Sequence, residues 1–81
     1  MEALDGNAIA GDLLAELGRD VTAETGRCTR CGTTSVIAEL RVYTQAPGAV
    51  ARCPGCDGVL IVVVSISGRT RVHLAHLELA G

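Results

Sequence analysis

The sequence has almost no aromatic side chains. Of its 81 residues only Tyr43 is aromatic, and neither Trp nor Phe occurs. Its core must therefore consist of Val, Leu, Ile and Ala, which bury less apolar area per side chain than Phe or Trp. Because so short a chain also buries a small fraction of its surface, we expect a single domain, residues 1–81, that needs a stabilising element besides its hydrophobic core.

Two further absences concern membranes and secretion. The longest apolar run, "VLIVVV" at 59–64, is far shorter than the roughly 20 residues of a membrane-spanning helix. The stretch "MEALDGNAIAGDLLAELG" at 1–18 has acidic residues where a signal peptide has basic ones. We therefore expect a cytoplasmic protein without a membrane segment, whose cysteines stay reduced.

Residues 5–19 follow the pattern of an amphipathic helix. Asp5 or Asn7 is suited to cap its start, and Gly18 is suited to end it. Its apolar residues fall in one arc, opposite the charged ones; they are Ile9, Ala10, Leu13, Leu14 and Leu17. We expect an N-terminal helix within residues 1–20 that packs on the rest of the protein, because a lone helix of this length is unstable in water.

The remaining residues, 21–81, are predicted to form a β domain. The segment "VIAELRVY" at 36–43 alternates between apolar and polar residues, which predicts one half-buried strand. The segment "VLIVVVSI" at 59–66 has no polar residue before Ser65, which predicts a central strand covered on both sides. One helix covers only one face of a sheet, so we expect Ile61 and Val63 to need cover from a second copy of the chain.

Turn sequences connect these strands. "APGA" at 46–49 fits a type II turn into "AVARC", and "SGRT" at 67–70 fits a tight hairpin into "RVHL", with Val72 and Leu74 directed inward. The sequence therefore predicts a small α+β fold, in which an N-terminal amphipathic helix precedes an antiparallel sheet of three to five strands.

Four cysteines form two C-x-x-C pairs. We name "CTRCG" at 28–32 the first knuckle and "CPGCD" at 53–57 the second knuckle; 21 residues separate the pairs, which is close to the spacing of four-cysteine zinc sites. Both sulfurs of such a turn can approach one metal ion while backbone N–H groups point at them. Gly32, and Asp57 with Gly58, supply residues that adopt the left-handed conformation required after the second cysteine. We therefore assign one metal ion to the cysteine cluster: Cys28, Cys31, Cys53 and Cys56.

In these knuckles the chain resembles a zinc ribbon, in which two cysteine knuckles sit at the tips of hairpins. The resemblance covers roughly residues 21–74 and implies one structural Zn²⁺. With "LDGNAIAGDLLAELG" ahead of the ribbon, the chain is also similar to a family of small uncharacterised bacterial proteins, which implies a ribbon and no activity.

The knuckles also resemble the rubredoxin pattern, C-x-x-C-G followed by C-P-x-C-G, which implies iron and electron transfer. Rubredoxins pack aromatic rings around the iron, whereas this chain has only Tyr43. Asp57 also stands where that pattern has Gly. Zinc is therefore favoured over iron, and thiol redox chemistry is a further alternative.

Catalysis is not expected. Four thiolates leave no open position on a zinc ion, and the sequence has no Ser/His/carboxylate set, glycine-rich phosphate loop or paired acid motif. His73 and His76 are three residues apart on a predicted strand, so they face opposite sides and cannot chelate together. We expect them to be ordinary surface histidines.

Charge is distributed unevenly along the chain. Residues 1–24 carry six acidic side chains against Arg19, whereas residues 25–81 carry six arginines against three acidic side chains. A basic ribbon suggests nucleic-acid binding. A Zn(Cys)4 centre is formally 2−, however, and screening its thiolates occupies nearby arginines. The chain also has no aromatic surface on which bases could stack, so nucleic-acid binding is the second candidate function.

The leading expectation is a non-catalytic zinc ribbon that serves as a protein-interaction module. Its partner would be another protein or a second copy of the chain, with no small-molecule substrate. The N-terminal helix either covers the sheet or docks to that partner.

Overall fold

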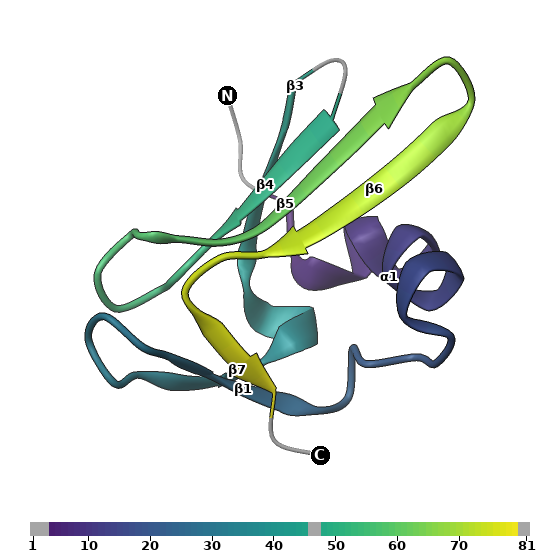
Figure 1. Cartoon of the computed structure of the whole chain (residues 1–81). Helices are drawn as coiled ribbons and strands as arrows, with labels where there is room; N and C mark the ends of the chain where they lie inside the picture. Colours follow the sequence, from purple (N-terminus) through teal and green to yellow (C-terminus); the bar gives the residue numbers. More distant parts are fainter. Residues whose placement is uncertain (1–3, 46–47, 80–81) are drawn as a thin grey trace.

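The computed structural model describes residues 4–45 and 48–79 (Figure 1). Within these residues a 3-10 turn and a short helix come first, and seven strands follow, interrupted by a second 3-10 turn. The elements are η1 (Gly6–Ile9), α1 (Ala10–Leu17), β1 (Thr25–Cys28), β2 (Thr34–Val36), η2 (Ile37–Glu39), β3 (Arg41–Gln45), β4 (Gly48–Arg52), β5 (Val59–Ile66), β6 (Arg69–Leu74) and β7 (Leu77–Leu79). This is the predicted small α+β fold, with a helix ahead of antiparallel strands.

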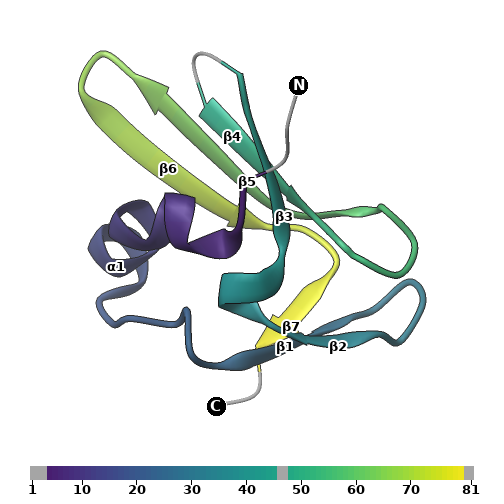
Figure 2. The same ribbon diagram turned by 180° about the vertical axis from the view of Figure 1, so that it is seen from behind.

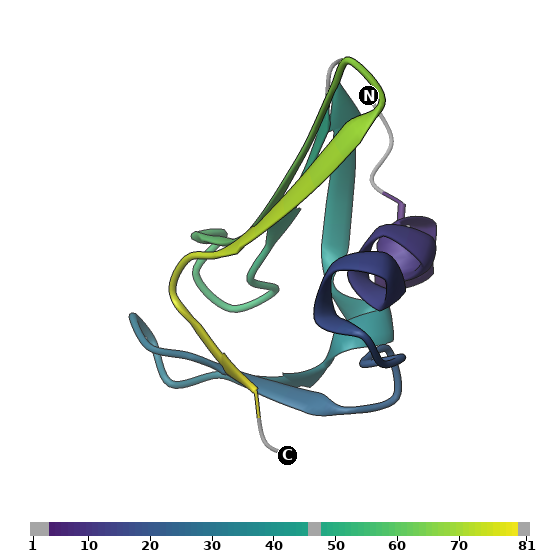
Figure 3. The ribbon, with the colours of Figure 1, turned by 45° about the vertical axis from the view of Figure 1, so that its right-hand side comes forward.

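The strands divide between two sheets instead of forming the expected one. One sheet has the order β2-β1-β7 and the other the order β3-β4-β5-β6, and neighbouring strands are antiparallel in both. The two sheets diverge from the β6–β7 connection (Figure 3). Helix α1 lies at one end of the space between them, and the two knuckle loops lie at the opposite end (Figures 1 and 2).

The predicted single strand at 36–43 is wrong, because the chain breaks after Val36. It turns through η2 and resumes as β3 at Arg41. The side chain of Ile37 is fully buried, with 0 % exposure. Its N–H donates to the carbonyl of Glu24 at 2.9 Å, and η1 packs against η2. Burial of Ile37 between the elements therefore overrides the local strand pattern.

Helix α1 is shorter than predicted because its first turn is 3-10. The carboxylate of Asp5 caps that turn by accepting a hydrogen bond from the N–H of Asn7 at 3.1 Å. The predicted end is confirmed at Gly18, which has a left-handed φ of 76°. On the predicted apolar arc, Leu13 is fully buried, whereas Leu14 is 50 % exposed. The buried face of α1 is therefore narrower than the apolar arc that the sequence predicts.

Strand β5 is central, as predicted, but only one of its faces is covered. Ile61 and Val63 are 1 % and 4 % exposed and belong to the core. Val62 and Val64, on the other face, are half-exposed. The prediction that Ile61 and Val63 lack cover is therefore wrong, and the residues on the open face are Val62 and Val64.

The β5–β6 hairpin forms as the sequence predicts. Ile66 pairs with Arg69, and the two residues between them have positive φ angles of 52° at Ser67 and 76° at Gly68. A turn with two left-handed residues matches the twist of the flanking strands. The type II turn predicted at 46–49 lies partly outside the described residues, although β3 and β4 pair on either side of it.

The core is one cluster of aliphatic side chains and two cysteines. Its buried members are Ile9, Leu13, Val21, Cys28, Ile37, Leu40, Val42, Ala49, Ala51, Cys53, Leu60, Ile61, Val63 and Leu77. Among the described residues, no helix has the length and apolar character needed to cross a membrane.

Candidate metal centre

The four sulfurs of the cysteine cluster lie within 4.8 Å of one another. Cys28 Sγ is 3.8 Å from Cys56 Sγ, and Cys31 Sγ is 3.6 Å from Cys53 Sγ. These separations are too long for disulfides, and all four cysteines are free. A tetrahedron with metal–sulfur bonds of about 2.3 Å has edges of about 3.8 Å. The cluster is therefore positioned to bind one metal ion.

Each knuckle occupies a hairpin tip, and the hairpins belong to different sheets. The first knuckle connects β1 with β2 in the three-stranded sheet, and the second connects β4 with β5 in the four-stranded sheet. A metal ion held by both knuckles therefore links the two sheets at the end remote from α1.

The two knuckles share one backbone pattern. The N–H of the first cysteine donates to the carbonyl five residues on, which belongs to Thr33 or Gly58, at 2.8 Å in both knuckles. In return the N–H of Gly32 or Asp57 donates to the carbonyl of that cysteine at 2.8 or 2.9 Å. Gly32 and Asp57 have φ angles of 82° and 61°, which confirms the left-handed prediction at these two residues. Gly58, which the sequence also offered, does not have a positive φ.

Backbone N–H groups point at the sulfurs, as expected for a knuckle. The N–H of Gly55 donates to Cys53 Sγ at 3.3 Å. The N–H groups of Cys31 and, to a smaller extent, Arg30 lower the pKa of Cys28. These donors stabilise thiolates, which are the form in which cysteine binds a metal.

The pKa of Cys31 is lowered well below its ordinary value. The Thr33 side chain has its Oγ1 atom 3.1 Å from Cys31 Sγ. Hydrogen bonds from the hydroxyl and the backbone N–H of Thr33 to the thiolate lower the pKa of Cys31 to about 6. The sequence did not identify Thr33 as part of the centre. The C-x-x-C motif specifies only the cysteines, and nothing in it marks the residue two positions after Cys31.

The pKa of Cys56 is shifted in the opposite direction, above its ordinary value. The backbone N–H of Gly58 is the largest single influence and lowers its pKa, but desolvation and the three neighbouring sulfurs together raise it to about 11. Four thiolates so close together repel one another, and a bound cation removes that penalty. The cluster therefore favours a cation over four free ionised thiols.

The knuckles also contact each other directly. A Cβ placed on Gly55 would lie 2.3 Å from Thr33 Oγ1, so Gly55 allows the second knuckle to approach Thr33. A Cβ placed on Gly58 would lie 3.2 Å from Cys56 Sγ and 3.5 Å from Arg30 Cδ. Glycine at these two positions permits the close approach that brings the sulfur atoms together.

Burial differs within each C-x-x-C pair. Cys28 and Cys53, the first cysteines, are 0 % and 1 % exposed, whereas Cys31 and Cys56 are exposed. One side of the centre is therefore part of the hydrophobic core, and the other side is open to solvent.

The arginines beside the knuckles have different partners. Arg27 Nη1 donates to Glu78 Oε1 at 3.1 Å, which connects β1 with β7. Arg52 Nη1 donates to the backbone carbonyl of Asp57 at 2.9 Å. Arg52 therefore supports the second knuckle, and in the part of the chain that the structure describes no carboxylate lies within salt-bridge distance of it.

Neither histidine joins the cysteine cluster. His73 lies exposed on β6, and His76 lies exposed in the connection between β6 and β7. The described residues show one group that could hold a metal ion, and it contains cysteines only. The carbonyl of His76 accepts a hydrogen bond from the N–H of Thr29 at 2.9 Å, which ties the β6–β7 connection to the first knuckle.

Taken together, the fold and the centre define a small α+β protein with a four-cysteine metal-binding site formed by two hairpin knuckles. The chain belongs to the "Family of unknown function (DUF6510)", whose model matches residues 1–80. Comparison with curated proteins and with solved structures gave no match.

Proposed function

We propose that the protein is a non-catalytic zinc ribbon in which one structural Zn²⁺ joins the two sheets. The observation that carries this proposal is the convergence of four sulfurs, two from a hairpin of each sheet, within 4.8 Å. Four thiolates complete a tetrahedral zinc shell and leave no position for water or substrate. Zinc would thus supply folding energy to a chain whose aliphatic core is small.

The surroundings of the four sulfurs favour zinc over iron. Neighbouring sulfurs separated by 3.6 and 3.8 Å fit either ion in a tetrahedral site. No aromatic ring lines the centre, since Tyr43 lies on β3. A rubredoxin-like electron carrier is the less favoured alternative for this reason.

Metal analysis of the purified protein, together with its visible absorption spectrum, tests the zinc assignment. We expect one zinc ion per chain and no visible absorption. A red protein that contains iron would contradict the assignment and favour electron transfer.

The cellular role that we propose is that of a cytoplasmic protein-interaction module. The open face of the four-stranded sheet supports it: Val50, Val62 and Val64 are half-exposed there, and Ile66 is 60 % exposed. Uncovered aliphatic residues in one patch are typical of surfaces that meet a protein partner.

Self-association through this face can be tested on the purified protein alone. We expect sedimentation at tens of micromolar to detect dimers, and we expect Val62→Lys to abolish them because a charge cannot be buried without a partner. Ala15→Lys is the control, because it adds the same charge at an exposed position on α1, outside this face, and it should leave dimers intact. A monomer at every concentration would contradict self-association.

Nucleic-acid binding is the second candidate function. The observation in its favour is that Arg30 and Arg52, in or next to the knuckles, have no carboxylate partner within salt-bridge distance among the described residues. Binding of DNA or RNA that weakens steeply with added salt would support it. Binding unaffected by salt, or none, would contradict it.

A further inference from the structure

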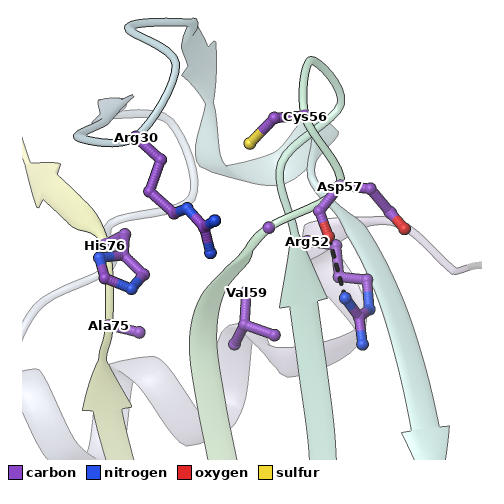
Figure 4. A pocket seen from close by; sticks show the side chains of 8 residues that line it. Arg30, Arg52, Cys56, Asp57, Val59, Ala75 and His76 are labelled. Atoms are coloured by element: carbon purple, nitrogen blue, oxygen red, sulfur yellow. Dashed lines mark hydrogen bonds between the residues drawn. The ribbon is translucent and has the colours of Figure 1, made fainter.

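A hollow of about 520 Å³ lies on the solvent side of the metal centre (Figure 4). Its walls come from the first knuckle, the second knuckle, the start of β5 and the β6–β7 connection. The lining residues are Arg30, Arg52, Cys56, Asp57, Gly58, Val59, Ala75 and His76. These segments are distant in sequence, so only the assembled fold creates this hollow.

Basic groups predominate in the hollow. The side chain of Arg30 extends from the first knuckle to lie between His76 and Val59 (Figure 4). Arg52 lines the hollow from the end of β4. Neither arginine is within salt-bridge distance of a carboxylate in the part of the chain that the structure describes, whereas Arg27 is paired with Glu78.

The one acidic residue of the hollow does not neutralise these arginines. The side chain of Asp57 points away from Arg30 and His76 (Figure 4). Arg52 uses Nη1 to donate to the backbone carbonyl of Asp57 at 2.9 Å, and its remaining N–H groups are not engaged by that contact. Among the described residues, the side chains of Arg30 and His76 therefore have no hydrogen-bond partner, and Arg52 keeps N–H groups that can donate to a ligand.

We propose that this hollow binds the phosphate group of an organic phosphate monoester. Guanidinium groups donate paired hydrogen bonds to phosphate oxygens, and a neutral or protonated imidazole adds another donor. Val59 and Ala75 provide an apolar part of the wall, which suits the organic body of the ligand. The volume also lies within the range of small-ligand pockets.

The neighbouring thiolates limit the affinity without excluding the anion. Cys56 borders the hollow, and a bound divalent cation offsets only part of the charge of the four thiolates. Backbone N–H groups of both knuckles compensate more of it. We therefore expect weak binding, with a dissociation constant of about 1 mM or somewhat below.

The test is a titration of the metal-loaded, ¹⁵N-labelled protein with phenyl phosphate, followed by amide chemical shifts. We expect saturable shifts centred on Gly58, Val59, Ala75 and His76. Arg30→Gln and Arg52→Gln should each weaken binding roughly tenfold, as loss of a charged hydrogen bond does. Arg30→Lys keeps the charge but not the paired donors, so its effect should be smaller.

Arg71→Gln is the matched control, because it removes the same charge from exposed β6. It should change the dissociation constant less than twofold, in keeping with the weak effect of a remote, screened surface charge. Metal content and circular dichroism of every variant separate loss of binding from loss of the fold. Absence of saturable shifts, or equal weakening by Arg71→Gln, would overturn the proposal.

A competition arm identifies the source of the phosphate. If a short single-stranded oligonucleotide without a terminal phosphate displaces phenyl phosphate from the same residues, the site accepts phosphodiesters and the monoester proposal is overturned. If an equal concentration does not, the site holds and serves a small phosphorylated molecule. The assay uses no protein partner, so its outcome is independent of the proposed interaction role.

Discussion

The two sheets differ in what holds them together. The four-stranded sheet is built on long hairpins, and its inner face supplies most of the buried strand residues: Val42, Ala49, Ala51, Ile61 and Val63. The three-stranded sheet has strands of 3 or 4 residues, and its buried strand residues are Gly26, Cys28 and Leu77. The smaller sheet therefore depends on the knuckles and on residues that bridge the sheets.

The difference between the two sheets explains why a metal ion is useful between the knuckles. At one end of the space between the two sheets, α1 packs on β6. At the opposite end, the cysteine cluster lies between the sheets. A short sheet with few apolar residues cannot offset its loss of conformational entropy by burial alone. A cation bound to both knuckles fixes the smaller sheet to the larger one.

Removing the metal should have the largest effect. Structural zinc sites contribute on the order of 10 kcal/mol, which is comparable to the whole stability of a small domain. We expect a chelator to unfold the protein cooperatively, as followed by circular dichroism, and Cys28→Ser to have the same effect. A metal-free protein that kept both sheets would contradict the dependence of the fold on the cluster.

Truncation of Ile37, which lies between the two sheets, should have the second largest effect on stability. Ile37 is fully buried in the turn that joins β2 to β3, so Ile37→Ala should lower the free energy of unfolding by about 2–5 kcal/mol, as cavity-forming substitutions do. Leu14→Ala is the control: Leu14 is 50 % exposed, and its loss should cost less than about 1 kcal/mol. Denaturant titration of the metal-loaded variants measures both. Equal effects would show that η2 does not carry the contact between the sheets.

Acid should weaken metal binding by the cysteine cluster. Metal binding requires thiolates, and the metal-free pKa of Cys56 is raised to about 11, so binding near pH 7 releases its proton. Affinity therefore rises with pH and falls about tenfold per unit on acidification for each proton released. Below pH 6 the dependence should steepen, since Cys31, with a pKa of about 6, then also loses a proton on binding.

Competition with a metallochromic chelator across pH 5.5–8 would measure this slope, which should correspond to release of at least one proton above pH 6 and of more below it. Thr33→Val removes the hydroxyl that lowers the pKa of Cys31, and it should move the steepening to higher pH. A flat pH profile would contradict the assignment of protonated Cys56 in the metal-free protein.

The smallest effect is expected at the helix. A Cβ on Gly11 would meet no heavy atom within 4 Å, and Gly11 lies within α1. Gly11→Ala should therefore stabilise the metal-loaded protein by about 0.5–1 kcal/mol through lower entropy of the unfolded chain. Thermal unfolding provides the measurement. A destabilised variant would mean that the helix end requires the flexibility of glycine.

The cysteine cluster and the ends of several elements could be predicted because they depend on local chemistry. Gly18 ends α1, and Ser67 with Gly68 closes the β5–β6 hairpin, since each position requires a left-handed residue. In the same way the backbone of each knuckle is determined within six residues, as the matching hydrogen bonds show. The spacing of the cysteines then indicates that both knuckles serve one ion.

The break at Ile37 could not be predicted, because the alternation at 36–43 is equally compatible with a continuous strand. What decides it is a contact with η1, in which a Cβ on Gly6 would lie 1.8 Å from the carbonyl oxygen of Ile37. The covered face of β5 depends in the same way on long-range packing, in which α1 lies against the neighbouring strand β6. Neither contact has a signal in the local sequence pattern.

The sequence by itself determined the composition of the core, the helix, the hairpin turns and the four sulfur ligands, because these follow from side-chain chemistry and from backbone preferences over a few residues. The tertiary structure decided the division into two sheets, the open face of β5, the pairing of Arg27 with Glu78 and the hollow around Arg30 and His76. Those features join segments far apart in the chain, and their free energy depends on packing that only the folded molecule brings about.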